Sequence, residues 1–419
     1  MYANTIKELP VYQQIPVPFQ VTLEELVAKL HSCGYADQTI SFYEQAAFHF
    51  SFWLTKRGVS LSRVKEDHLA DFLSRHLLHC QCPLGGVRQK NTVQAALGHF
   101  AATLREAGYL TRSQTSQVDH IDREVQHFDD YLLHTVGLQE ATRLYRRRYA
   151  REFLQEFFPA RDIDPLRLSP ENVVAYLSKR SAGLIPASLQ VLASSLRSYF
   201  RFLRLQGRCG EDLILAVPAA ANWCLASLPA VLTDQEVEHL LSVFDLNTAA
   251  GRRDYAITRC LVDLGLRAQE VARLRLDDLD WRRGILRIVT TKSRRDDELP
   301  LPEAIGAAIA AYLRRGRPQT TAREVFLRVR PPVGQSVTRR TVCDLILRAA
   351  VRAGMESTIT GTRILRHTAA TRMLRHGASI KEIADVLRHK CLDTTTIYTK
   401  VDLARLAAVA LPWPVQEDR

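Results

Sequence analysis

The spacing of apolar residues constrains the fold of this chain more than any other feature. Through the first 210 residues, apolar side chains recur every three or four positions, as in Phe48, Phe52, Leu69, Phe72 and Leu73. This spacing places them on one face of an α-helix, whereas the alternation typical of strands is nearly absent. We therefore expect the first half of the chain to consist of packed amphipathic helices.

The helical region also contains one pattern twice. Segments 39–43, 67–73 and 97–108 are followed about 100 residues later by the similar segments 142–145, 171–177 and 196–207. We interpret these as two small helical modules, residues 20–110 and 121–209, joined by a polar segment. The alternative is chance similarity between amphipathic helices.

Capping residues predict where several helices begin. Thr22, Thr233 and Ser379 each precede a glutamate by three positions, the pattern in which a hydroxyl and a carboxylate satisfy the first free N–H groups of a helix. Ser169 is followed by Pro170, and proline is favoured in the first helical turn. We expect a helix to start at each of these four positions.

The pattern changes after a linker at residues 210–230. Residues 284–291 are apolar and β-branched, a polar turn follows, and residues 298–301 read as a second strand, so a hairpin is expected. Helices are expected at residues 303–315, 338–353, 365–377 and 379–388. The predicted fold class is mainly α with a small β-sheet in the last domain, residues 231–419.

The chain is basic, and one helix concentrates this charge. There are 57 Lys and Arg against 45 Asp and Glu, which gives a formal charge of +12. Five arginines and two tyrosines crowd one stretch, and guanidinium groups suit a DNA phosphate backbone. The alternative is a solvated charged helix with packed stems. The arginines are Arg143, Arg146, Arg147, Arg148 and Arg151.

Other features argue against membranes and disulfides. The longest apolar stretch, residues 216–232, is interrupted by polar residues and prolines, and residues 1–20 lack a signal-peptide pattern. We expect a cytoplasmic protein without a membrane partner. Its eight cysteines are expected to stay reduced.

Two groups of side chains invite a metal hypothesis. His76, His79, Cys80 and Cys82 could hold zinc, but a C-x-C pair lacks the gap of common zinc knuckles, so a loop with incidental ligands is favoured. Asp277, Asp278 and Asp280 could serve a two-metal nuclease. Because they lie between a helix and a strand, turn formation and capping are favoured. No glycine-rich phosphate loop is present, and we expect neither a metal nor a cofactor.

The last domain carries five separated elements in order. These are Arg267, the hairpin lysine Lys292, the run Leu365-Arg366-His367-Thr368-Ala369-Ala370-Thr371, the Leu-x-His ending at His389, and Tyr398. Together they resemble the tyrosine recombinase, or phage integrase, family, in detail over residues 230–405. The resemblance implies a recombinase catalytic domain preceded by a core-binding domain at residues 121–209. The first module, residues 1–110, is additional and corresponds to an arm-type DNA-binding or partner-binding domain.

The resemblance also implies a mechanism. Tyr398 would attack the scissile phosphate of double-stranded DNA and form a 3′-phosphotyrosyl link, with no metal or ATP. Arg267 and Arg366 would clamp the phosphate oxygens, Lys292 would protonate the leaving 5′ oxygen, and His389 would bind the phosphate. Four protomers would assemble on two DNA sites, associated with the nucleoid, with the segment 403–410 docking into a neighbouring subunit.

One position departs from the family pattern. Arg363 stands where the family has His or Lys, three residues before Arg366. Arginine keeps the positive charge but cannot exchange a proton near neutral pH, so phosphate binding survives and acid–base chemistry does not. Two other hypotheses stay open: a type IB topoisomerase-like enzyme that relaxes DNA without a specific site, and a non-catalytic DNA-binding accessory subunit. Integration, excision, transposition and dimer resolution are all open biological roles.

Overall fold

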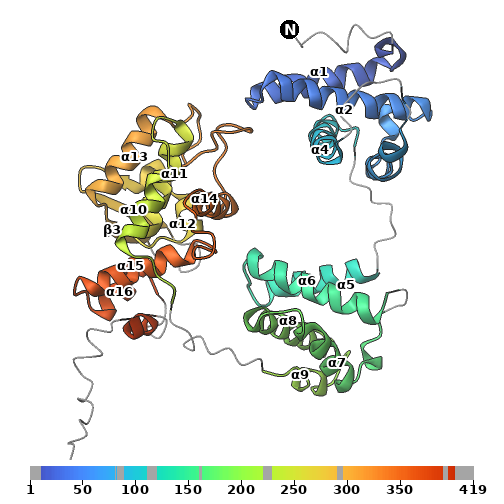
Figure 1. Ribbon diagram of the computed structural model, residues 1–419. Coiled ribbons are helices and arrows are strands. Elements are labelled where there is room, and N and C mark those ends of the chain that lie inside the picture. The colour runs from blue at the N-terminus through green and yellow to red at the C-terminus, as the bar shows by residue number, and fades with distance from the viewer. Residues whose placement is uncertain are drawn as a thin grey trace, which may run out of the picture. The chain divides into compact units, whose positions relative to one another are not determined.

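The computed structural model describes residues 11–80, 82, 89–110, 120–159, 163–219, 229–289, 296–389 and 395–401. The described part is mainly helical, with one small antiparallel sheet near the middle of the last domain (Figure 1). This confirms the predicted fold class. Among the described residues, every helix is too short or too polar to serve as a membrane span.

The N-terminal region consists of helices, as the apolar periodicity predicts. The main helices are α1 (Val17–Ser32), α2 (Asp37–Lys56), α3 (Glu66–Asp71) and α4 (Lys90–Glu106), with short 3-10 turns η1 (Tyr12–Gln14) and η2 (Leu61–Arg63). Helix α3 continues into a π-helical turn, η3 (Phe72–His76), and a 3-10 turn, η4 (Leu77–His79). Phe50 and Phe100 meet edge to face between α2 and α4.

The helix start predicted at Thr22 is wrong. Helix α1 begins at Val17, with Pro18 in its first turn. Thr22 is buried inside the helix, where its hydroxyl donates to the backbone oxygens of Pro18 and Phe19. A threonine hydroxyl can bond to the preceding turn as readily as it caps a helix, so the Thr-x-x-Glu pattern was ambiguous here.

The second helical region has a compact core of its own. It contains α5 (His120–His134), α6 (Glu140–Phe157), η5 (Pro165–Arg167), α7 (Pro170–Ser181), α8 (Pro186–Leu205) and α9 (Asp212–Leu215). Ser169 caps α7 and Pro170 is its first residue, as predicted. Phe128, Phe153 and Phe200 are fully buried between α5, α6 and α8. Helix α9 lies within the predicted linker, and its Leu213 joins this core.

The two regions repeat the same order of elements. Helices α1, α2, α3 and α4 correspond in sequence order to α5, α6, α7 and α8. Gly108 after α4 and Gly207 after α8 both have a positive φ, a conformation that ends a helix and that glycine adopts without steric cost. This shared order supports an internal duplication.

The last region combines helices with the predicted hairpin. Strands β1 (Leu279–Asp280), β2 (Ile285–Val289) and β3 (Asp296–Pro300) form one antiparallel sheet in that order, with Val289 opposite Asp296. The sheet is preceded by α10 (Asp234–Ser242), α11 (Ala249–Val262), α12 (Ala268–Arg273) and the 3-10 turn η6 (Leu276–Asp278). It is followed by α13 (Glu303–Arg315), α14 (Arg339–Arg352), α15 (Arg363–Arg375), α16 (Ile380–Leu387) and the 3-10 turn η8 (Thr396–Val401).

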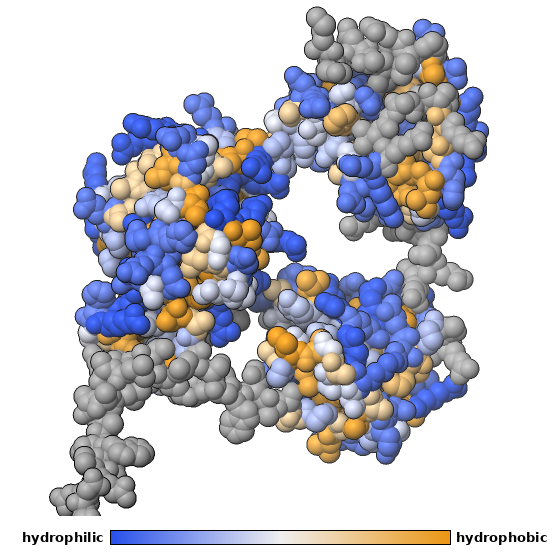
Figure 2. All heavy atoms as spheres, viewed as in Figure 1, coloured by the Kyte–Doolittle hydropathy of each residue, from blue (hydrophilic) through white to orange (hydrophobic). Residues whose placement is uncertain are grey.

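Helices α13 to α16 match their predicted ranges within two residues. Thr233 and Ser379 form the expected capping boxes with Glu236 and Glu382. A core of aliphatic side chains from α10 to α15, including Ile257, Val271 and Ile346, holds the helices around the sheet. Hydrophilic side chains, interrupted by apolar ones, make up most of the visible face of the last region (Figure 2).

Candidate active site

Arg366 lies in the second turn of α15 and is held by backbone oxygens rather than by a carboxylate. Its guanidinium donates to the carbonyl of Gly265, at 2.5 Å, and to the carbonyl of Leu387. Gly265 has a positive φ, and a Cβ there would lie 2.6 Å from a methyl group of Leu387, so this close approach requires glycine. Burial, together with the charge of Arg267, lowers the pKa of Arg366 to about 9.

Glu270 positions two further arginines next to Arg366. One carboxylate oxygen accepts from the side chain of Arg267 at 2.8 Å, and the other accepts from Arg388 at 2.7 Å. Although burial acts to raise it, the pKa of Glu270 is held below its ordinary value by Arg388 and Arg267. Glu270 thus fixes the positions of two arginine side chains.

Arg388 was not among the predicted site residues. It adopts the left-handed conformation, with φ of 54°, at the end of α16, which is uncommon outside glycine. Its side chain is only 6% exposed, and its backbone oxygen accepts from Arg267 at 3.5 Å. The Leu-x-His pattern gave its position, but nothing in the sequence indicated the ion pair with Glu270.

His389 and Tyr398 stack beside these arginines. Their ring centroids are 6.5 Å apart and the rings are nearly parallel. His389 Nδ1 is 2.7 Å from the hydroxyl of Thr395. Burial, aided by the charges of Arg366 and Arg267, lowers the pKa of His389 to about 4, so the imidazole is neutral at pH 7 in the free protein.

Tyr398 is buried in this state. Its ring packs on Ala370, Leu374, Ile383 and Leu387 and is 2% exposed. Its hydroxyl lies 3.0 Å from Nδ1 of His367. Burial raises the pKa of the phenol, although Arg366, Arg363 and Arg267 act to lower it. The side chain of Tyr398 is therefore shielded from solvent.

His367 is the immediate partner of that hydroxyl. Burial, with the charges of Arg363 and Arg366, lowers its pKa to about 4. A neutral imidazole can accept the phenolic proton in a hydrogen bond. His367 therefore orients the hydroxyl of Tyr398.

Of the two remaining predicted catalytic residues, the structure describes Arg363 but not Lys292. Arg363 is exposed at the first position of α15, and its charge acts on His367 and Tyr398. Lys292, which falls between β2 and β3 in the sequence, lies outside the described residues. The segment 403–410 also lies outside them.

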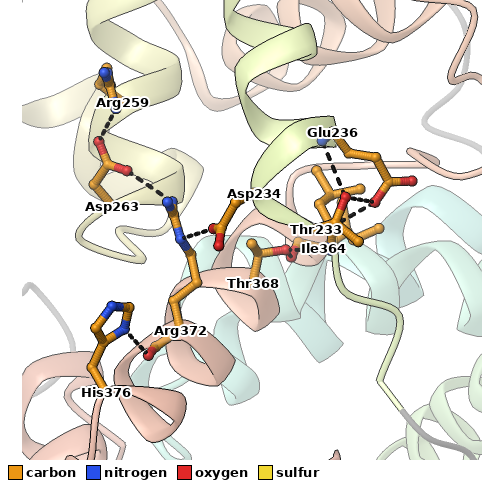
Figure 3. Close-up of polar contacts among 10 residues, drawn as sticks. Thr233, Asp234, Glu236, Arg259, Asp263, Ile364, Thr368, Arg372 and His376 are labelled. Carbon is orange, nitrogen blue, oxygen red and sulfur yellow. Dashed lines mark hydrogen bonds and ion pairs between the residues drawn. The ribbon is translucent and has the colours of Figure 1, made fainter.

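A polar network anchors the far end of α15 (Figure 3). Arg372 pairs with Asp234 of α10 at 2.8 Å and with Asp263 at 3.4 Å. Asp263 also pairs with Arg259 of α11, at 3.2 Å. The hydroxyl of Thr368 accepts from the backbone N–H of Leu232. These contacts fix the helix that carries Arg363, Arg366 and His367.

The arginines of α6 all have partners inside the protein. Arg143 and Arg147 both pair with Asp129, at 3.0 and 2.9 Å, and with Glu140. Arg146 donates to the backbone oxygen of Ser194. Arg148 pairs with Glu152 and Arg151 with Asp122, and these two side chains remain 61% and 44% exposed.

Asp277, Asp278 and Asp280 serve as turn and capping residues. Asp278 accepts from the backbone N–H of Arg275, and Asp280 accepts from those of Arg282 and Arg283. Asp277 pairs with Arg323. The preferred interpretation of this acidic group is confirmed.

Comparison with known proteins gives a consistent result. Residues 230–405 match the model of the phage integrase family. The chain is 36% identical over 369 residues to the putative integrase/recombinase y4rA of Sinorhizobium fredii, covering 87% of each chain. It is 32% identical to the tyrosine recombinase XerD of Listeria innocua over 59% of this chain and 82% of that protein.

Two solved structures share the fold. The recombinase XerH, bound to its palindromic difH substrate in a post-cleavage complex, matches 74% of this chain and 93% of its own, with a TM-score of 0.57 and 17% identity. The Tn1549 transposon integrase in complex with transposon right end DNA matches 68% and 99%, with a TM-score of 0.53 and 17% identity.

Proposed function

Because the chain belongs to the phage integrase family of tyrosine recombinases, enzymes of site-specific DNA recombination, we propose that it cuts and rejoins DNA through a 3′-phosphotyrosyl link to Tyr398. One observation carries the proposal. The buried Tyr398 hydroxyl adjoins a cluster in which the guanidinium of Arg366 donates to two backbone carbonyl oxygens rather than to a carboxylate. Such a group keeps its charge for an anionic ligand.

The chemistry needs three kinds of group. The phenol of Tyr398 gives its proton to the neutral imidazole of His367, whose Nδ1 lies 3.0 Å from the hydroxyl, and the phenolic oxygen bonds to phosphorus. The bond from phosphorus to the 5′ oxygen breaks, and that oxygen takes up a proton. Arg267 and Arg366 stabilise the negative charge that develops on the phosphate oxygens, with His389 as a further donor. Lys292 supplies the proton to the 5′ oxygen. Rejoining is the same sequence in reverse.

This exchange of one phosphodiester for another is near energy balance, so it needs neither ATP nor a metal ion. Arg363 contributes positive charge near the phosphate and takes no part in proton transfer. His367 holds the phenol in the buried position until DNA is bound. His389 is neutral in the free protein. A bound phosphate raises the pKa of this imidazole, because a nearby anion favours the charged form, so His389 takes up a proton only when DNA is bound.

The relatives also suggest how DNA is bound. The XerH and Tn1549 structures are complexes with DNA, and we propose double-stranded DNA with specific sites as the substrate here. The exposed arginines Arg148 and Arg151 of α6 contact its phosphates. A tetramer on two sites then exchanges strands, and such a substrate places the enzyme on the nucleoid in the cytoplasm.

A covalent trap tests the proposal without knowledge of the target site. The protein is mixed with a pool of random-sequence duplexes, each nicked so that a cleaved fragment diffuses away, and adducts are isolated under denaturing conditions and sequenced. We expect adducts enriched in one sequence. Tyr398→Phe abolishes them, while Tyr255→Phe, a tyrosine that contacts Arg259 in the same domain, leaves them unchanged.

Each alternative has its own outcome in this trap. Adducts without sequence preference indicate the relaxing, topoisomerase-like activity. Retention of DNA without any adduct indicates an accessory subunit. An adduct that persists in Tyr398→Phe would falsify the assignment of the nucleophile.

A further inference from the structure

Four potential metal ligands meet in the N-terminal region, far in sequence from the active-site residues. They are His49 of α2, His76 at the end of the π-helical turn η3, and Cys80 and Cys82, which follow η4. One ligand atom from each lies within 4.8 Å of all the others. His79, which the sequence grouped with them, is exposed and lies outside the cluster.

His49 is the member that the sequence could not supply. It lies on α2 in a run of nine buried residues, 46–54, and is 7% exposed. An imidazole among apolar side chains requires polar partners. Its Nε2 atom lies 3.2 Å from Sγ of Cys80, 31 residues further along the chain.

The backbone around the cysteines departs from regular helix. Helix α3 gives way to the π-helical turn η3 and then to the 3-10 turn η4. The corresponding helix of the second region, α7, runs from Pro170 to Ser181 without interruption. Single π-helical turns are rare in proteins, and those that do occur are often found at functional sites. Here the irregular turns lead from His76 to Cys80.

The arrangement suits a tetrahedral ion. Zinc binds two thiolates and two imidazoles at roughly 2.3 and 2.0 Å, so ligand atoms around it lie roughly 3.3–3.8 Å apart. The cluster needs only small movements to reach this geometry. The backbone N–H of Cys82 also donates to Sγ of Cys80, at 3.4 Å, and this hydrogen bond fixes the position of one of the two sulfur atoms.

We propose that His49, His76, Cys80 and Cys82 bind one structural zinc ion. Four protein ligands leave no position for water or substrate, which distinguishes a structural site from a catalytic one. The ion ties the irregular segment after α3 to the buried face of α2. The proposal is independent of the recombinase mechanism, because none of its residues belongs to the active site.

Metal content is the first test. The full chain is produced without a histidine tag, dialysed, and analysed for zinc by mass spectrometry. We expect about one zinc per chain, and after removal with a chelator we expect Co²⁺ to give the visible absorption of a tetrahedral thiolate site. A chain that contains less than about one tenth of an equivalent of zinc, and that gives no such spectrum with Co²⁺, would overturn the proposal.

Matched variants locate the ion. Cys80→Ser and His49→Gln are expected to lose zinc and the cobalt spectrum. Cys33→Ser and His79→Gln, a cysteine and a histidine of the same region outside the cluster, are expected to keep both. Equal zinc content in all four variants contradicts the site.

A second readout covers the case in which a ligand variant folds poorly. Chelation of the wild-type chain is expected to lower the temperature at which the N-terminal region unfolds, and added zinc is expected to restore it. An unfolding curve that is the same with and without bound zinc contradicts a structural role.

Discussion

Arginines cluster in two regions of this protein, and their surroundings differ. On α6, Arg143 and Arg147 share the buried carboxylate of Asp129, so their charge is largely neutralised within the protein. In the last region, Arg366 is held by two backbone carbonyls. Carbonyl dipoles orient a guanidinium without cancelling its charge. Arginine content therefore does not by itself identify a phosphate-binding surface, and the two clusters differ instead in the groups that hold their arginines.

Among the described residues, one carboxylate pairs with the arginines that surround Arg366, and this sharpens the contrast. Glu270 pairs with both Arg267 and Arg388, so three arginines share one negative charge. On α6 and its neighbours, the carboxylates of Asp122, Asp129, Glu140 and Glu152 face the arginines. The excess of positive charge lies where the predicted nucleophile also lies.

The largest expected effect is on cleavage. Arg366→Ala should lower the rate of adduct formation by about 10²–10³-fold, the usual cost of removing a preorganised donor from a transition state. Arg366→Lys should recover little, because an ammonium cannot donate to two carbonyls and a phosphate in the same fixed plane. The rate is measured with the adduct assay.

Arg375→Ala is the matched control, since Arg375 is exposed at the last turn of the same helix. If Arg375→Ala and Arg366→Ala slow cleavage equally, the proposed phosphate clamp is wrong.

Removing a partner of the α6 arginines should lower the stability of the protein rather than the rate of DNA cleavage. Asp129→Ala leaves Arg143, whose side chain is 12% exposed, without its buried partner. We expect a loss of about 3 kcal/mol in the free energy of unfolding of this region, because an unpaired buried charge is costly and Glu140 compensates only in part. Urea denaturation followed by circular dichroism measures it.

Asp130→Ala is the control, because Asp130 is an exposed carboxylate on the same helix as Asp129 and accepts a hydrogen bond from the exposed Gln126. A loss of less than about 0.5 kcal/mol is expected there. Equal losses in the two variants would show that the Asp129 pairs contribute nothing beyond surface charge.

A smaller effect should appear in the pH dependence of stability. His367 and His389 have pKa values of about 4 in the folded protein, against 6.5 ordinarily. Between these values the unfolded chain binds more protons, so stability is full above pH 6.5 and falls as the pH drops toward 4. Both side chains are half-buried, so solvent screens part of the effect. We expect the free energy of unfolding to fall by about 2 kcal/mol in total over this pH range.

The double variant His367→Gln/His389→Gln should flatten this dependence, as measured by denaturation at several pH values. His376→Gln, an exposed histidine one residue beyond α15, should not change it. A slope that is unchanged in the double variant assigns the acid sensitivity elsewhere.

Sequence patterns predicted most of the fold because they act locally. The caps at Ser169, Thr233 and Ser379 need only residues three positions away. The prediction of a helix start at Thr22 was wrong for the same reason. Pro18 favours an earlier start of the helix, and a local pattern cannot decide between two possible starts.

The site was predictable only in part. Arg267, Arg366 and His389 come together as the family resemblance implied. The contact of His367 with Tyr398 and that of Glu270 with Arg388 depend on where the chain returns after many residues. His49 joins the cysteine cluster for the same kind of reason, and spacing along the sequence carries no signal of it.

The smallest expected effect concerns the one α6 arginine that is mostly exposed. Arg148 is 61% exposed and has a single surface carboxylate partner, so it is the member of that helix best able to exchange Glu152 for a phosphate. Arg148→Ala should weaken binding to random-sequence duplex DNA by less than about ten-fold and reduce the slope of log affinity against log salt by about one. Arg167→Ala removes an arginine of similar exposure and pairing outside α6, and should leave that slope unchanged. If the two variants behave alike, α6 does not face DNA, and its arginines serve only the packing of the helices around Asp129.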